Sequence, residues 1–365
     1  MKIPEIKSLE VSYRDRLVGT ISLDANGCCV FEYDAEWLVD GFSISPLKLP
    51  LKAGMTVAGY QPFSGNFGIF EDSMPGGYGE YLIQRILHSG GIGYRSLNPL
   101  QRLGIVGSAG MGALCYRPEI KIVEEQPAAS FDMLQKMALE VLSEKTDEYA
   151  DKLYVSGGNS GGARPKALFS NEDGHWIIKF RHTYDPKNIG EIEYLYNQAA
   201  RECGIDVPEF RLVEGKYFAE RRYDIEDGQR LHVATAAGLL DETIFPPKMD
   251  YHSLLQLTGY LTQSPEQVEQ QFRRMCFNVY AENMDDHARN FSFICRNGKW
   301  SLSPAYDLTN DRTLGEHATS VNGSGLPTDE DLIAVGCDIR ISRARCLEII
   351  HQVRPIATDL LSNIK

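Results

Sequence analysis

Residues 283–294 read NMDDHARNFSFI, and residues 301–308 read SLSPAYDL. In the first stretch Asp285 precedes Asn290 by five positions, and Asp307 follows seventeen positions after Asn290. Phosphoryl transfer needs a carboxylate that orients the acceptor hydroxyl, together with an amide oxygen and a second carboxylate for Mg²⁺. Protein kinases space their catalytic Asp and metal-binding Asn in the same way. The pattern therefore predicts Asp285 as the catalytic base and Asn290 and Asp307 as Mg²⁺ ligands.

The segment that joins these motifs supports the same interpretation. Two apolar runs, FSFIC and WSLSPAY, are separated by RNGK, which predicts a β-hairpin that carries Asn290 and Asp307 toward one site. Taken alone, DDHARN would be a solvated loop with a capping Asp. A metal-hydrolase site at residues 285–287 is another alternative, but the chain offers no second ligand cluster of the same quality.

A glycine-rich segment, GGNSGGARPK at residues 157–166, precedes a predicted strand, HWIIKF at residues 175–180. Small residues let backbone N–H groups approach phosphate oxygens, although a flexible turn explains the segment equally well. Lys179 in the strand is typical of the kinase lysine that pairs with the α- and β-phosphates and with a helix glutamate, for which Glu193 is the candidate. The alternative for Lys179 is an ordinary surface lysine.

The stretch FAERRYD at residues 218–224 leaves a predicted strand just before the helical half of the chain. A kinase hinge would lie at this place, and backbone groups around Glu220 and Arg222 would then meet the adenine. An edge strand with alternating charges is the alternative, and the sequence does not separate the two.

The composition limits the class of protein. The 365 residues are 43% hydrophobic and 24% charged, which is ordinary for a soluble globular chain with two or more domains. The chain has no apolar run of bilayer length and no long apolar signal segment at its start, so we expect a cytoplasmic protein without membrane contact. A net charge of −13 gives no general attraction to nucleic acid. Eight cysteines without a CxxC pair give a zinc or redox site little support.

The periodicity along the chain predicts an α+β protein in three parts. Alternation over residues 9–35 predicts a small antiparallel sheet with a turn at residues 24–27, and Ser130 is expected to cap the helix that follows it. Helices are also expected from near Tyr78 and over IGEIEYLYNQAARECG. We expect a β-rich module at residues 1–120, an N-lobe-like region with the Gly-rich loop at 131–230, and a helical lobe with the catalytic and metal-binding loops at 231–365.

Taken together, these segments resemble the HipA family of serine/threonine kinases, toxins of bacterial toxin–antitoxin systems. DDHARNFSFI resembles the family's catalytic loop, PAYDL its metal-binding motif, GGARPKALF its ATP-loop motif and ERRYD its hinge. VSYRDRLVGTISL, FEDSMPGGYG and VGSAGMGALCY resemble the small module that precedes the kinase core. The resemblance covers nearly the whole chain, which is shorter than the better-known members of the family.

The resemblance implies a kinase-like fold with a divergent N-lobe and a helical C-lobe, and ATP and Mg²⁺ as cofactors. It implies that His287 sits beside the catalytic Asp, although a buried histidine that only positions the loop is an equal alternative. It also implies a loop serine that the kinase phosphorylates in itself, which shuts off ATP binding. Counted from the loop lysine, this position falls at Asn159 or Ser160, and we choose Ser160 for its hydroxyl. The residues expected to bind ATP are Ser160, Gly161, Gly162, Ala163, Lys166, Lys179, Glu220 and Arg222.

The family also implies partners. Its substrates include aminoacyl-tRNA synthetases, and its usual partner is a small HipB-like helix-turn-helix antitoxin, through which DNA would be contacted only indirectly. Two alternatives to a protein kinase toxin remain: a small-molecule kinase of the same fold, and a catalytically weak co-repressor that binds the antitoxin. The intact set of Lys179, Asp285, Asn290 and Asp307 argues against the co-repressor.

Overall fold

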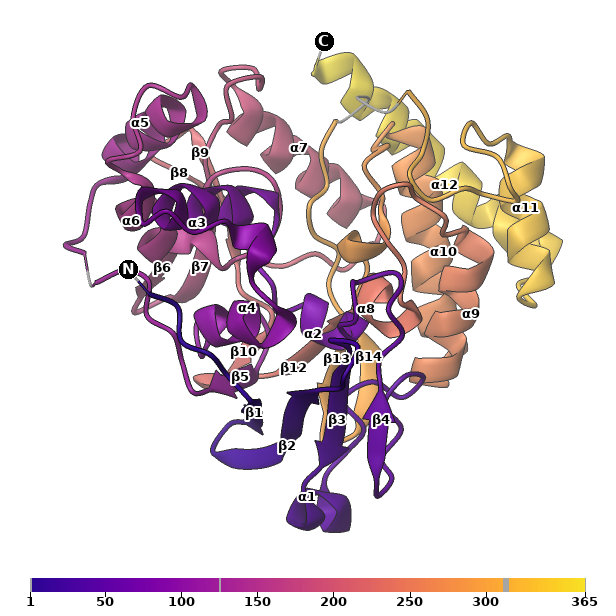
Figure 1. Ribbon diagram of the computed structural model, residues 1–365. Helices are drawn as coiled ribbons and strands as arrows, with labels where there is room; N and C mark the ends of the chain where they lie inside the picture. Colours follow the sequence, from indigo (N-terminus) through magenta and orange to yellow (C-terminus); the bar gives the residue numbers. More distant parts are fainter. Residues whose placement is uncertain (1, 125, 311–314, 365) are drawn as a thin grey trace. The chain divides into compact units, whose positions relative to one another are not determined.

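The alternating N-terminal segment forms the antiparallel sheet that its sequence predicts. In the computed structural model, which describes residues 2–124, 126–310 and 315–364, this sheet has five strands in the order β4-β3-β2-β1-β5 (Figure 1). The expected turn at residues 24–27 joins the second and third strands, and the Gly27 N–H donates to the Asp24 carbonyl oxygen at 3.1 Å. The strands are β1 (Ser8–Tyr13), β2 (Arg16–Leu23), β3 (Cys29–Tyr33), β4 (Met55–Val57) and β5 (Leu114–Arg117).

Short helices connect these strands. The helix expected near Tyr78 is confirmed as α3 (Gly77–Ser89). Helix α4 (Pro99–Val106) begins with a reciprocal cap, in which the Asn98 side chain accepts from the Gln101 N–H and the Gln101 side chain accepts from the Asn98 N–H. The remaining helices of this part are α1 (Ala35–Asp40), α2 (Gly68–Glu71) and the 3₁₀ turn η1 (Tyr94–Ser96).

A second, four-stranded sheet has the order β6-β7-β9-β8. Its strands are β6 (Lys166–Asn171), β7 (Gly174–Lys179), β8 (Phe210–Val213) and β9 (Tyr217–Arg221). The helix before this sheet, α5 (Phe131–Leu142), starts as expected at Ser130, whose side chain accepts from the Met133 N–H. Between α5 and β6 lie α6 (Ala150–Leu153) and the π-helical turn η2 (Tyr154–Gly158), and after β9 comes a small hairpin of β10 (Ile225–Glu226) and β11 (Gln229–Arg230).

The C-terminal part is mainly helical, as its sequence predicts. The expected hairpin of β13 (Ser292–Arg296) and β14 (Lys299–Leu302) is confirmed, and its two turn residues, Asn297 and Gly298, have φ of 52° and 81°. With β12 (His232–Thr235) it forms a three-stranded sheet in the order β12-β13-β14. The helices are α7 (Ile189–Glu202), α8 (Ala236–Leu240), α9 (Tyr251–Thr262), α10 (Pro265–Tyr280), the 3₁₀ turn η3 (Ala288–Asn290), α11 (Asp329–Asp338) and α12 (Arg343–Asn363).

The chain divides into two compact units. Unit 1 comprises residues 1–190 and 212–233, and unit 2 comprises residues 191–211 and 234–365. Unit 1 thus contains the five-stranded sheet and nearly all of the four-stranded sheet, and unit 2 contains nearly all of α7 and the packed helices α9 to α12. The predicted three-part division stays a prediction. Within the described ranges, no helix is both long and apolar enough to cross a membrane.

Candidate active site

The predicted catalytic loop connects α10 to β13 in unit 2. The Asp285 side chain is 42% exposed, so its carboxylate is accessible from solvent. The Nε2 atom of His287 lies 3.8 Å from the Asp285 carboxylate, so His287 lies beside the predicted catalytic Asp. The Asn290 side-chain amide donates to the Asp285 carbonyl oxygen at 2.7 Å and closes the loop. This bond uses the amide nitrogen of Asn290 and leaves its oxygen as the atom suited to a cation.

A buried polar network anchors this loop. The Asp286 side chain is fully buried, accepts from the Tyr251 hydroxyl at 2.7 Å and from the Thr319 N–H at 3.2 Å, and lies 3.1 Å from His317 Nδ1. The Thr319 hydroxyl donates to the Asp286 carbonyl oxygen, and the Asn278 amide donates to the Tyr251 hydroxyl at 2.9 Å. Burial, and then the charge of Asp286, raise the pKa of Tyr251 well above its usual range, so Tyr251 remains a donor. The sequence pattern alone did not indicate this anchor.

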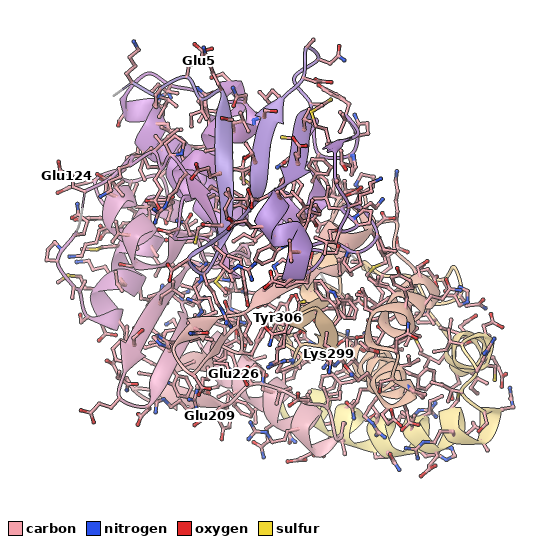
Figure 2. All side chains as sticks on the ribbon, turned by 90° about the horizontal axis from the view of Figure 1, so that it is seen from below. Glu5, Glu124, Glu209, Glu226, Lys299 and Tyr306 are labelled. Carbon is pink, nitrogen blue, oxygen red and sulfur yellow. The ribbon has the colours of Figure 1, made fainter. Side chains whose placement is uncertain are left out.

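The segment that carries Asp307 is tied to the catalytic loop. The Tyr306 hydroxyl, whose residue is labelled in Figure 2, donates to the Arg289 carbonyl oxygen at 2.7 Å and lies 2.6 Å from the Ser292 hydroxyl. Asn290 and Tyr306 also border the same small cavity. Asp307 itself has φ of 53°, a left-handed conformation that costs about 1–3 kcal/mol at a non-glycine residue and is typical of functional sites.

The residues of unit 2 fit the expected Mg²⁺. Asn290 and Asp307 offer amide and carboxylate oxygens, which are ligands that this hard cation prefers. In the described parts of the chain, no three His, Cys, Asp or Glu side chains form a cluster that could hold a metal. Such a cluster is not required, because Mg²⁺ is commonly bound by one or two carboxylates plus substrate phosphates.

The Gly-rich loop lies in unit 1, between η2 and β6. Gly161 and Gly162 both have φ of 74°, a conformation that an L side chain rarely adopts. Ser160 is buried, and its hydroxyl donates to the Gly157 carbonyl oxygen. At the end of the loop, the Arg164 Nε atom contacts both carboxylate oxygens of Asp185 at 3.0 and 3.1 Å. The loop is therefore fixed at both ends in this conformation.

The two predicted phosphate lysines lie opposite each other on neighbouring strands. Lys166 on β6 pairs with Lys179 on β7 in the antiparallel register, and both residues are buried. Like charges directly opposite each other destabilise a sheet, and a carboxylate beside them offsets that repulsion. The Lys179 ammonium lies 3.6 Å from the Glu220 carboxylate, whose side chain is 8% exposed. Within unit 1, Glu220 is thus an acidic neighbour of Lys179. The pairing of Lys179 with Glu193, which lies on α7 in unit 2, stays a prediction.

The predicted hinge residues occupy the end of β9. The Glu220 side chain points toward Lys179, and the Arg222 guanidinium forms a two-point ion pair with Asp224 at 2.6 and 2.9 Å. The Arg222 N–H donates to the His175 carbonyl oxygen at 2.8 Å. This N–H is therefore already used, and an adenine contact at Arg222 would have to use its carbonyl oxygen. Contact with adenine at both positions stays a prediction.

Two family models match the chain. The HipA N-terminal domain matches residues 9–117, and the HipA-like C-terminal domain matches residues 158–360. A protein of Sinorhizobium fredii (strain NBRC 101917 / NGR234), named "Putative kinase Y4dM", is 24% identical over 360 residues, which cover 88% of this chain and 82% of that protein.

One solved structure shows the same fold. HipA of Shewanella oneidensis MR-1, solved in a complex with HipB and its operator DNA, has a TM-score of 0.72 at 18% identity and covers 98% of this chain and 90% of that chain. This likeness confirms the expected α+β architecture. The kinase CtkA of Helicobacter pylori covers 54% of this chain and 89% of its own at 14% identity, but its TM-score of 0.37 supports no conclusion.

Proposed function

Because the chain belongs to the HipA family, we propose that it is an ATP- and Mg²⁺-dependent serine/threonine protein kinase that acts as a toxin. The observation that carries the proposal is the catalytic loop. It exposes the Asp285 carboxylate and closes through the Asn290 amide. The loop also rests on the fully buried Asp286. A carboxylate held in this way is suited to receive the proton of a substrate hydroxyl.

The proposed reaction transfers the γ-phosphoryl group of ATP to a serine or threonine hydroxyl. The hydroxyl oxygen forms a bond to the γ-phosphorus, its proton passes to Asp285, and the bond to the ADP oxygen breaks. Asn290 and Asp307 would hold Mg²⁺, which neutralises charge on the phosphates. In unit 1, the Gly-rich loop and the cations of Lys166 and Lys179 would bind the phosphate oxygens, and the backbone near Glu220 would bind the adenine.

We also infer the partner and location from the family. The Shewanella HipA was solved with HipB and operator DNA, which supports a HipB-like helix-turn-helix antitoxin as the partner of this chain. With a net charge of −13, the chain would reach DNA only through that antitoxin. An aminoacyl-tRNA synthetase is the substrate that the family suggests, and the cytoplasm is the compartment where such a target is found.

Two substitutions test the roles of base and metal ligand. Asp285→Asn should retain binding of ATP·Mg²⁺ but abolish phosphoryl transfer, because the proton acceptor is lost while the metal ligands remain. Asp307→Asn should abolish Mg²⁺-dependent nucleotide binding, because a ligand carboxylate is lost. Calorimetry with ATP·Mg²⁺ and transfer from labelled ATP into a cell lysate measure the two effects, and Asp359→Asn on the exposed face of α12 is the control.

The lysate also distinguishes the proposal from its alternatives. Label on a protein serine or threonine supports a protein kinase, whereas label on small molecules alone would indicate a small-molecule kinase. Full phosphoryl transfer by the Asp285→Asn variant would refute the assignment of the base.

A further inference from the structure

The start of helix α3 packs against the backbone of the Gly-rich loop. Its N-terminal residues include Gly76 and Gly79, and we name the segment Gly76–Gly79 the glycine seat. A β-carbon added at Gly76 would overlap the backbone of Gly162, and one added at Gly79 would overlap the carbonyl oxygen of Gly158. The Tyr78 N–H also donates to the Gly162 carbonyl oxygen at 3.2 Å. The seat therefore contacts the loop through main-chain atoms.

The backbone of the seat does not itself require glycine. Gly76 has φ of −69°, which any residue adopts, and Gly79 lies within a regular helix. Glycine inside a helix is less favourable than alanine, because more backbone entropy is lost when it folds. Because glycine has no side chain, it allows α3 to approach the loop closely. Both positions are thus explained by the contact and not by local conformation.

The contact holds the loop on both sides of Ser160. Gly158 and Gly162, which the seat touches, precede and follow Ser160 in the loop. The Ser160 hydroxyl is buried and donates to the Gly157 carbonyl oxygen. A phosphate adds nearly two negative charges and three large acceptor oxygens, which this closed arrangement cannot accommodate. Phosphorylation of Ser160 therefore requires the backbone between Gly158 and Gly162 to rearrange, and these are the two residues that the seat contacts.

We propose that the glycine seat of the N-terminal module holds the phosphate-binding loop in its closed state and so controls when Ser160 becomes accessible to phosphorylation. The effect on Ser160 phosphorylation rests on the proposed kinase function. The contact between the seat and the loop does not depend on that function. The seat links the β-rich N-terminal module to the nucleotide loop. A partner that moved α3 would therefore alter ATP binding without contacting the nucleotide.

Three alanine variants in one helical turn test the proposal. Gly76→Ala and Gly79→Ala insert a methyl group into the loop backbone, whereas the matched control Gly77→Ala meets only Ala163 atoms at 3.8 Å, an ordinary contact. Two clashing positions are used so that one variant remains if the other does not fold. Thermal unfolding of each variant shows whether it is folded. Overpacking a close contact destabilises it enough to raise the population of the open loop about tenfold.

The first readout does not depend on activity. Amide hydrogen exchange over residues 156–166 of the nucleotide-free protein should become at least about tenfold faster in the clashing variants and stay unchanged in the control. The second readout combines each variant with Asp285→Asn and supplies active wild-type enzyme with ATP·Mg²⁺. Phosphate on Ser160, located by peptide mapping, should then appear faster in the clashing variants than in the control.

The two readouts test separately whether the seat holds the loop and whether it controls the phosphorylation of Ser160. Unchanged loop exchange in both clashing variants would overturn the role of the seat, whatever the enzyme does. Faster exchange without faster phosphorylation of Ser160, under conditions where other proteins are labelled, would overturn the control of Ser160. If the wild type labels no protein at all, the proposed kinase function fails, and the exchange result still decides whether the seat holds the loop.

Discussion

Replacing Asp286 with alanine should destabilise unit 2 and reduce phosphoryl transfer. The carboxylate is fully buried and serves three partners: the Tyr251 hydroxyl, the Thr319 N–H and the His317 ring. Hydrogen bonds to a charged group contribute about 1.5–3 kcal/mol each. The net loss of stability is smaller than the sum of these contributions, because the substitution also removes the cost of burying a charge. We expect a loss of about 3–5 kcal/mol in the free energy of unfolding, the usual cost of breaking a buried charged network.

A second substitution shows whether the network acts as a unit. Tyr251→Phe removes only the hydroxyl that links Asn278 to Asp286, and it should cost about 1–3 kcal/mol. Because the two residues share a hydrogen bond, the double variant should lose less than the sum of the single losses, by about 0.5–3 kcal/mol. Additive losses would show that Tyr251 and Asp286 do not cooperate.

The assay must follow unit 2 separately, because two units can unfold in separate steps. Hydrogen exchange of peptides from α9 and α10 in increasing urea reports on that unit directly. The Asp286→Ala variant should also lose transfer activity while nucleotide binding by unit 1 residues remains. A loss below about 0.5 kcal/mol, within the range of an ordinary surface substitution, would refute the anchoring role.

Two further predictions concern toxicity and acid stability. Expression of the chain in a bacterial host should arrest growth, and Asp285→Asn should relieve the arrest; an arrest that persists in this variant would point to an effect other than phosphoryl transfer. Burial lowers the pKa of His232 to about 4, and its Nε2 atom lies 2.8 Å from the Ile44 carbonyl oxygen. Since the unfolded chain binds the proton near pH 6.5, the stability that neutral His232 contributes is complete above that pH and is lost as the pH falls to 4, by up to about 3 kcal/mol. Denaturant titrations of wild type and His232→Gln across this range should show a flatter pH dependence in the variant, and equal slopes would contradict the prediction.

The features that the sequence predicts correctly are set by nearby residues. The β13–β14 hairpin follows from two apolar runs around an Asn–Gly turn, and α5 follows from Ser130 before an amphipathic run. Asp285 and Asn290 are also close in sequence, and the bond between the Asn290 side chain and the Asp285 backbone closes the loop between them, while their roles as base and metal ligand stay predictions. In each of these cases the interacting residues lie within a few positions of one another.

The features that the sequence analysis missed depend on residues far apart in the chain. Lys179 meets Glu220 because β7 pairs with β9 in a register that places Ile177 opposite Glu220, and a whole helix separates the two strands in sequence. In the sequence, the glycine seat is recognisable only as part of the FEDSMPGGYG motif of the N-terminal module. Its paired glycines were a signal of close backbone approach, but the sequence did not show which segment approaches.

The two adjacent acids of the predicted catalytic loop differ sharply in exposure. The sequence allowed DDHARN to be a solvated loop with a capping Asp or a loop with a catalytic Asp, and the catalytic role of Asp285 stays a prediction. Asp286 is fully buried and Asp285 is 42% exposed. Asp286 accepts hydrogen bonds from the Tyr251 hydroxyl and the Thr319 N–H, which fix the loop at that residue. Because Asp285 is its neighbour in the chain, the buried acid anchors the backbone that presents the exposed one.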